Sequence, residues 1–130
     1  MLLILLALGC SNNEPLDQDQ TANRQVQAEG LEDQMKALYD EILMLIEDKS
    51  CNGGSTCKTI AIGAKACGGP VDYLVYSSTH VNEALLIKKL KEYKSLNIQY
   101  NKLNGIFSDC MFETPPSVEC KDAQCVEVVY

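Results

Sequence analysis

The sequence contains no tryptophan, only two phenylalanines and one histidine among its 130 residues. The lack of tryptophan disfavours a sugar-binding site, because indole faces are well suited to stacking on sugar rings. The single histidine, His80, is the only candidate imidazole base, and acid–base or nucleophilic catalysis needs convergent polar groups. We interpret Asp72 and Asp109 as isolated carboxylates that cap turns. The sequence therefore predicts no catalytic residues and no enzymatic activity.

Basic residues are also scarce, since 11 lysines and arginines stand against 18 acidic residues, for a formal net charge of −7. An acidic chain without a basic stripe is a poor partner for nucleic acid, because phosphate neutralisation needs clustered positive charge. One lysine-rich stretch comprises Lys88, Lys89, Lys91 and Lys94. It is a candidate anion patch, although solvated pairing with an acidic first helix is the simpler interpretation. No apolar run approaches the roughly 20 residues that span a bilayer.

The first ten residues, MLLILLALGC, form a short apolar run that ends in small residues before a cysteine. The segment from Leu6 to Cys10 resembles a bacterial lipobox, the cleavage site of signal peptidase II. The resemblance implies a signal peptide over residues 1–9 and a lipidated Cys10, whose palmitate-type chains hold the protein at the membrane. The alternative, a buried N-terminal strand, is disfavoured because a polar segment would separate it from the core.

This N-terminal pattern predicts three parts and a location. Residues 1–9 are the signal peptide, residues 10–27 are the lipidated cysteine and a polar tether, and residues 28–130 form a single domain. We expect the protein in the bacterial cell envelope, lipid-anchored at the outer membrane or the cell surface.

Six cysteines remain once Cys10 is assigned to the anchor. An even number in an exported protein predicts three disulfides, each contributing roughly 2–4 kcal/mol to stability. A metal site or a redox site is the alternative, but no C-x-x-C motif occurs and His80 is far from the last cysteine pair. We therefore expect no metal and no cofactor, and the sequence leaves the pairing open. The predicted disulfide cysteines are Cys51, Cys57, Cys67, Cys110, Cys120 and Cys125.

Apolar residues at helical spacing predict two long helices. The first extends from about Thr21 or Gln25 to Asp48, and the second from about Thr79 to Asn104, ahead of a C-terminal cap at Gly105. Ser77, Ser78 and Thr79 offer oxygens for the N-terminal cap of the second helix. The seam of the first helix comprises Leu31, Met35, Leu38, Ile42 and Leu45. The seam of the second comprises Leu86, Leu90, Tyr93, Leu96, Tyr100 and Leu103.

Short runs rich in β-branched and aromatic residues predict strands over 58–62, 73–76 and 126–130, with weaker ones over 110–113 and 118–120. The segment between Cys120 and Cys125 predicts a hairpin turn. The predicted fold class is therefore α+β, with two long helices as an antiparallel hairpin and a small disulfide-rich antiparallel sheet.

The most distinctive segment is GAKACGGP over residues 63–70. It predicts a tight turn in which Gly68 and Gly69 adopt positive φ and a disulfide holds Cys67. A phosphate-binding loop is disfavoured, because the G-x-x-x-x-G-K-[ST] pattern is missing.

Several short strings together resemble a family of small cysteine-rich bacterial proteins that are secreted or lipidated. They are GAKACGGPVDYLVYS, Gln99-Tyr100-Asn101, Ser108-Asp109-Cys110, Pro116, Cys120 and Cys125. The resemblance covers about residues 51–126. It implies export and a shared fold, and it leaves the function open.

These patterns predict a non-catalytic, lipid-anchored envelope protein that binds another protein or supports the envelope. Its partners would be the membrane, through the lipid, and an envelope or extracellular protein, with no nucleic acid. One alternative is an enzyme inhibitor that presents the loop over residues 114–117. A second is an enzyme of unrecognised type, which a pocket containing His80 and two carboxylates would support. We expect four tyrosines to be half-buried in the core, unless two or three are exposed together as a recognition patch. They are Tyr73, Tyr76, Tyr93 and Tyr100.

Overall fold

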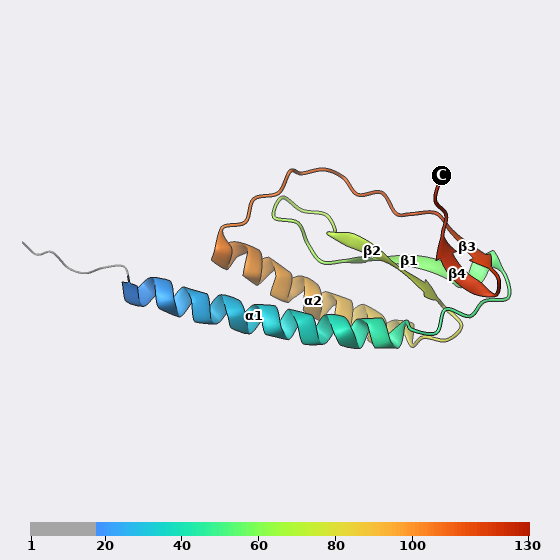
Figure 1. Ribbon diagram of the computed structural model, residues 1–130, viewed down its shortest axis with the longest axis horizontal. Helices are drawn as coiled ribbons and strands as arrows, with labels where there is room; N and C mark the ends of the chain where they lie inside the picture. Colours follow the sequence, from blue (N-terminus) through green and yellow to red (C-terminus); the bar gives the residue numbers. More distant parts are fainter. Residues whose placement is uncertain (1–17) are drawn as a thin grey trace, which may run out of the picture.

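The computed structural model describes residues 18–130 and shows two helices beside two β-hairpins (Figure 1). The order is α1 (Gln18–Leu45), a 3-10 turn (Gly54–Thr56), β1 (Cys57–Ile62), β2 (Asp72–Ser77), α2 (Glu83–Asn104), β3 (Val118–Lys121) and β4 (Gln124–Glu127). The predicted α+β class is confirmed. The β part differs in one respect, because it forms two separate two-stranded sheets, β1–β2 and β3–β4.

The two helices lie side by side as an antiparallel hairpin, as their apolar seams predict (Figure 1). Ile42 of α1 and Leu86 of α2 have no exposed surface, and Ile46, just past α1, is also buried. Ile62 and Tyr76 of the first hairpin complete the same cluster. The main core therefore lies where the C-terminal end of α1 meets the N-terminal half of α2 and the β1–β2 sheet.

The first helix differs from the prediction at both ends. It is already helical at Gln18, and it passes through Gly30 without a break. Every residue from 18 to 27 is exposed. The helix ends at Leu45 because the Asp48 carboxylate accepts hydrogen bonds from the backbone N–H and the hydroxyl of Ser50, which turns the chain.

The second helix begins at Glu83 instead of near Thr79. Its N-terminal cap is Asn82, whose side chain accepts a hydrogen bond from the N–H of Leu85 at 3.0 Å. The predicted caps are used elsewhere, since the hydroxyls of Ser77 and Ser78 donate to carbonyl oxygens of the segment before β1. At the other end Gly105 has φ 58°, which confirms the predicted left-handed cap.

The predicted hairpin between Cys120 and Cys125 is confirmed. Asp122 and Ala123 both have positive φ, at 52° and 58°, as a two-residue turn of type I′ requires. The last strand covers Gln124–Glu127 and ends before the predicted limit at residue 130. The predicted strand over 110–113 is wrong, because Cys110 has φ 57°, outside the β region.

Three disulfides pair the six cysteines of the described segment: Cys51–Cys120, Cys57–Cys125 and Cys67–Cys110. The first joins the β3–β4 hairpin to the segment before the 3-10 turn, and the second joins it to the start of β1, around a second small core. The third ties the turn between β1 and β2 to the segment after α2.

The predicted signal peptide over residues 1–9 and the lipidated Cys10 lie outside the described residues. No helix within residues 18–130 is both long and apolar enough to cross a membrane.

Candidate functional site

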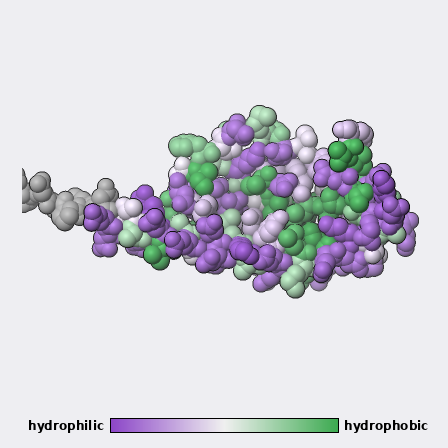
Figure 2. Space-filling view, viewed as in Figure 1, coloured by the Kyte–Doolittle hydropathy of each residue, from purple (hydrophilic) through white to green (hydrophobic). Residues whose placement is uncertain are grey.

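The loop over residues 105–113, here called the Phe loop, carries both phenylalanines of the chain on its surface. Phe107 is 96% exposed and Phe112 is 94% exposed, with Ile106 and Met111 exposed beside them. The loop leaves the end of α2 and arches over the β1–β2 hairpin (Figure 1). Figure 2 shows hydrophobic side chains along this upper edge of the molecule. Exposed apolar side chains are common at interaction surfaces, because apolar area is costly to leave in water.

The start and the middle of the Phe loop are fixed by local hydrogen bonds. The N–H of Ile106 donates to the carbonyl oxygen of Asn101 at 3.0 Å, across the cap at Gly105. The hydroxyl oxygen of Ser108 accepts from the N–H of Cys110 at 3.2 Å, and Asp109 Oδ1 accepts from the N–H of Met111 at 3.1 Å. These contacts hold Cys110 in its positive-φ conformation, between the two phenylalanines.

The Lys65 side chain holds the Phe loop through contacts with oxygen atoms of the loop. Its Nζ donates to the carbonyl oxygen of Met111 at 2.9 Å and to Glu113 Oε1 at 3.4 Å, and it lies 3.8 Å from Asp109 Oδ1. The Tyr73 hydroxyl donates to the carbonyl oxygen of Glu113 at 3.4 Å. Because the Lys65 side chain is only 15% exposed, its charge is held among these acceptors with little competition from water.

The turn that carries Lys65 has the predicted form. Gly68 and Gly69 adopt φ values of 97° and 80°, and Cys67 is held by its disulfide to Cys110. The N–H of Lys65 donates to the carbonyl oxygen of Gly69 at 2.9 Å, which closes the turn. A rigid turn is thus covalently joined to the middle of the Phe loop.

Two asparagines of α2 fix this turn to the helix. Asn97 Oδ1 accepts from the N–H of Ala64 at 2.8 Å, and the Asn101 side chain donates to the carbonyl oxygen of Ala64 at 2.8 Å. Gly63 precedes this contact with φ 75°, and a Cβ there would lie 2.9 Å from Asn97 Oδ1. Only glycine fits at this position.

The structure does not bring the predicted candidates for acid–base chemistry together. Asp72 begins β2 and His80 follows its end, so a strand of about 17 Å separates them. His80 Nδ1 lies 3.6 Å from an Asp48 carboxylate oxygen on the surface. Asp109 lies in the Phe loop, near Lys65.

Tyr76 is buried, and Tyr73, Tyr93 and Tyr100 are half-buried, as predicted. Tyr130, in contrast, is fully exposed. The buried Tyr76 hydroxyl donates to Glu83 Oε1 at 2.9 Å, and Lys58 Nζ donates to the same oxygen at 3.0 Å. Burial, with the Glu83 hydrogen bond, raises the pKa of Tyr76 to about 12. The hydrogen bonds from Lys58 and Tyr76 lower the pKa of the Glu83 carboxyl. The Tyr93 ring packs against Tyr39 with centroids 6.0 Å apart, and burial raises the pKa of Tyr93.

The sulfurs of Cys51, Cys57 and Cys125 all lie within 4.8 Å of one another and are buried. Thiolates, not disulfide sulfurs, are the usual ligands of zinc. As all three belong to disulfides, the present arrangement is a structural core and offers no thiolate at this place.

Comparison of the chain with protein-family models, with curated proteins and with solved structures gives no match. The function is therefore argued from the site. The sequence patterns did not predict that Phe107 and Phe112 are almost fully exposed. The available signal was that both phenylalanines flank a cysteine in a segment with glycine, serine and aspartate, where a buried strand is improbable.

Proposed function

We propose that this protein is a non-catalytic, lipid-anchored protein of the bacterial envelope that binds another envelope or extracellular protein through the Phe loop. The observation that carries the proposal is the near-complete exposure of Phe107 and Phe112 on a loop held by a disulfide and by Lys65. Aromatic side chains dominate the energetic centres of protein interfaces. A loop that is already ordered loses little conformational entropy on binding.

The anchoring part of the proposal rests on the sequence that ends in Cys10 and on the shape of α1. The helix carries an entirely exposed stretch over residues 18–27 at its N-terminal end. Such a stretch suits a spacer between a lipid anchor and a folded body. The non-catalytic part is supported by the separation of His80, Asp72 and Asp109.

The binding part is tested by the double variant Phe107→Ser/Phe112→Ser in the full chain. Because both side chains are exposed, the variant should fold and melt like the wild type. Crosslinking in native membranes and affinity capture should then lose the partner that the wild type retains. Met44→Ser is a matched control, since Met44 is 73% exposed on α1. Identical captured proteins for both variants would contradict the proposal.

An enzyme inhibitor is a second candidate function, favoured by one feature of the segment that follows the Phe loop. Residues 114–117 form a largely exposed loop between Cys110 and Cys120, which belong to two different disulfides. If the captured partner is an enzyme that loses activity on binding, and Pro115→Gly/Pro116→Gly relieves that loss, this candidate replaces the first.

A further inference from the structure

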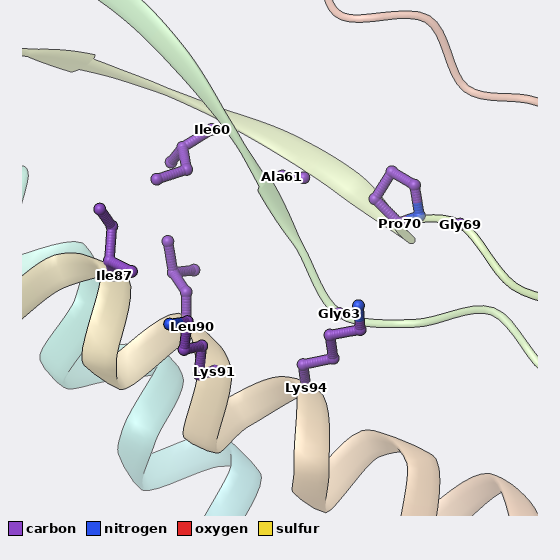
Figure 3. Close-up of a pocket in the computed structure, with 9 residues that line it drawn as sticks. All are labelled: Ile60, Ala61, Gly63, Gly69, Pro70, Ile87, Leu90, Lys91 and Lys94. Atoms are coloured by element: carbon purple, nitrogen blue, oxygen red, sulfur yellow. The ribbon is translucent and has the colours of Figure 1, made fainter.

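A groove of about 290 Å³ lies between α2 and the β1–β2 hairpin, apart from the Phe loop (Figure 3). Ile60 enters it from β1 and Pro70 from the turn, while Ile87 and Leu90 approach from α2 (Figure 3). The glycine at position 63 contributes no side chain to the lining. The groove is therefore mainly apolar and lies between α2 and the β1–β2 hairpin.

The polar side chains that line this groove are two lysines, Lys91 and Lys94. The Lys94 side chain extends toward Gly63 at one end of the groove (Figure 3). Neither lysine forms a salt bridge within residues 18–130, whereas Lys58, Lys65 and Lys89 all do. The Lys91 nitrogen lies by Leu90, apart from the Lys94 nitrogen (Figure 3). In a chain of net charge −7, the unpaired Lys94 ammonium makes one end of the apolar groove positively charged, which suits a bound anion.

We propose that the groove binds a single-chain aliphatic anion, of the class of medium-chain carboxylates. The alkyl chain lies along Ile60, Ile87 and Leu90, and the carboxylate accepts a hydrogen bond from Lys94 at the Gly63 end of the groove. Pockets for small ligands begin at about 300 Å³, so this volume suits one chain better than the two chains of a phospholipid. The proposal is independent of the partner-binding role of the Phe loop.

The test is calorimetric titration of the full chain with decanoate, decanol and decyltrimethylammonium, each below its micelle concentration. Decanoate should bind more tightly than decanol, and the cation should not bind. Affinity should rise about fourfold for each methylene added from octanoate to decanoate, the equivalent of about 0.8 kcal/mol.

Three variants locate the site. Lys94→Gln should weaken decanoate binding at least tenfold and leave decanol binding unchanged. Lys88→Gln is the matched control, because Lys88 is exposed on the same helix outside the groove, and it should bind decanoate like the wild type. Ile87→Ser removes an exposed apolar side chain from the lining of the groove and should weaken binding of both ligands.

The proposal is overturned if decanoate does not bind, or if decanol and decanoate bind alike. It is also overturned if Lys88→Gln has the same effect as Lys94→Gln, or if Ile87→Ser leaves the binding of both ligands unchanged. Binding of anionic phospholipid vesicles without decanoate binding would assign the lysines to a membrane surface instead.

Discussion

Asn97 shows how one buried polar side chain positions a distant surface loop. It is 8% exposed in the middle of α2, and with Asn101 it satisfies both backbone polar groups of Ala64, which is itself buried. Ala64 has left the β1 ladder, so its N–H and carbonyl need partners outside the sheet. The chain then continues to Lys65 and Cys67, which hold the Phe loop.

Asn97→Leu should therefore destabilise the protein by about 1–3 kcal/mol, because the N–H of Ala64 is left buried without an acceptor. Gln99→Leu, on the exposed side of the same helix, should change stability by less than about 0.5 kcal/mol. Urea unfolding with the disulfides intact measures both effects. Equal stability of the two variants would mean that the Ala64 contact contributes nothing.

Ionisation of Tyr76 should lower the free energy of unfolding at alkaline pH. Its pKa is raised to about 12 from an ordinary value of 10, so the neutral phenol is favoured in the folded state. The resulting stabilisation is fully present below pH 10 and is lost as the pH rises from 10 to about 12. The unfolding free energy should therefore fall more steeply over this range in the wild type than in Tyr76→Phe. Tyr130→Phe is the control, because Tyr130 is fully exposed, and it should follow the wild type.

At the scale of elements, the helices could be predicted from the sequence because each buries one face. Ile42 belongs to the apolar seam of α1, Leu86 and Leu90 are one turn apart in the seam of α2, and all three lie in the core. The helix ends were harder to predict, because serine can cap a helix or bind a distant carbonyl. Ser77 does the second, through the Ser50 carbonyl at 2.6 Å, and this bond depends on how β2 packs against the segment after α1.

The Phe loop could not be predicted, for a physical reason. The run Cys-Met-Phe-Glu over residues 110–113 has the composition of a strand, and only tertiary contacts exclude it. The disulfide of Cys110 to Cys67 and the contact of Lys65 with Met111 join segments more than 40 residues apart, and Cys110 itself adopts a positive φ. The six cysteines after Cys10 predict three disulfides without their pairing, so the sequence could not show which segment holds the loop.

Removal of the Cys67–Cys110 bridge should loosen the Phe loop and spare the core. In Cys67→Ser/Cys110→Ser, amide hydrogen exchange over residues 105–113 should accelerate at least tenfold, while α2 up to Leu96 exchanges as before. The other two disulfides still hold the β3–β4 hairpin to β1. Exchange measured by mass spectrometry checks this, and unchanged rates over 105–113 would show that hydrogen bonds alone order the loop.

At the scale of the whole molecule, a single exposed helix leads into the folded body. Residues 18–27 of α1 extend beyond the end of α2 and cover about 14 Å along the helix axis (Figure 1). The Phe loop lies on the other side of the β1–β2 hairpin from α1 (Figure 1). If Cys10 carries a lipid, the spacer places the body away from the bilayer with the Phe loop free to meet a protein.

Cys10→Ala should abolish lipidation and leave the protein unprocessed or released from the membrane. Metabolic labelling with a palmitate analogue, followed by membrane fractionation, measures both effects. Ser11→Ala is the neighbouring control and should label like the wild type. Equal labelling of the Cys10 variant would remove the anchor from the account.

The most direct measurement of the central claim is photocrosslinking from the Phe loop in the native envelope. A benzophenone amino acid at position 107 of the full chain should give a discrete protein adduct, which Phe112→Ser should suppress. The same probe at position 44, on the exposed face of α1, should give none. The absence of an adduct at position 107, a lipid adduct in its place, or the same adduct from both positions would contradict the role of the Phe loop in protein binding.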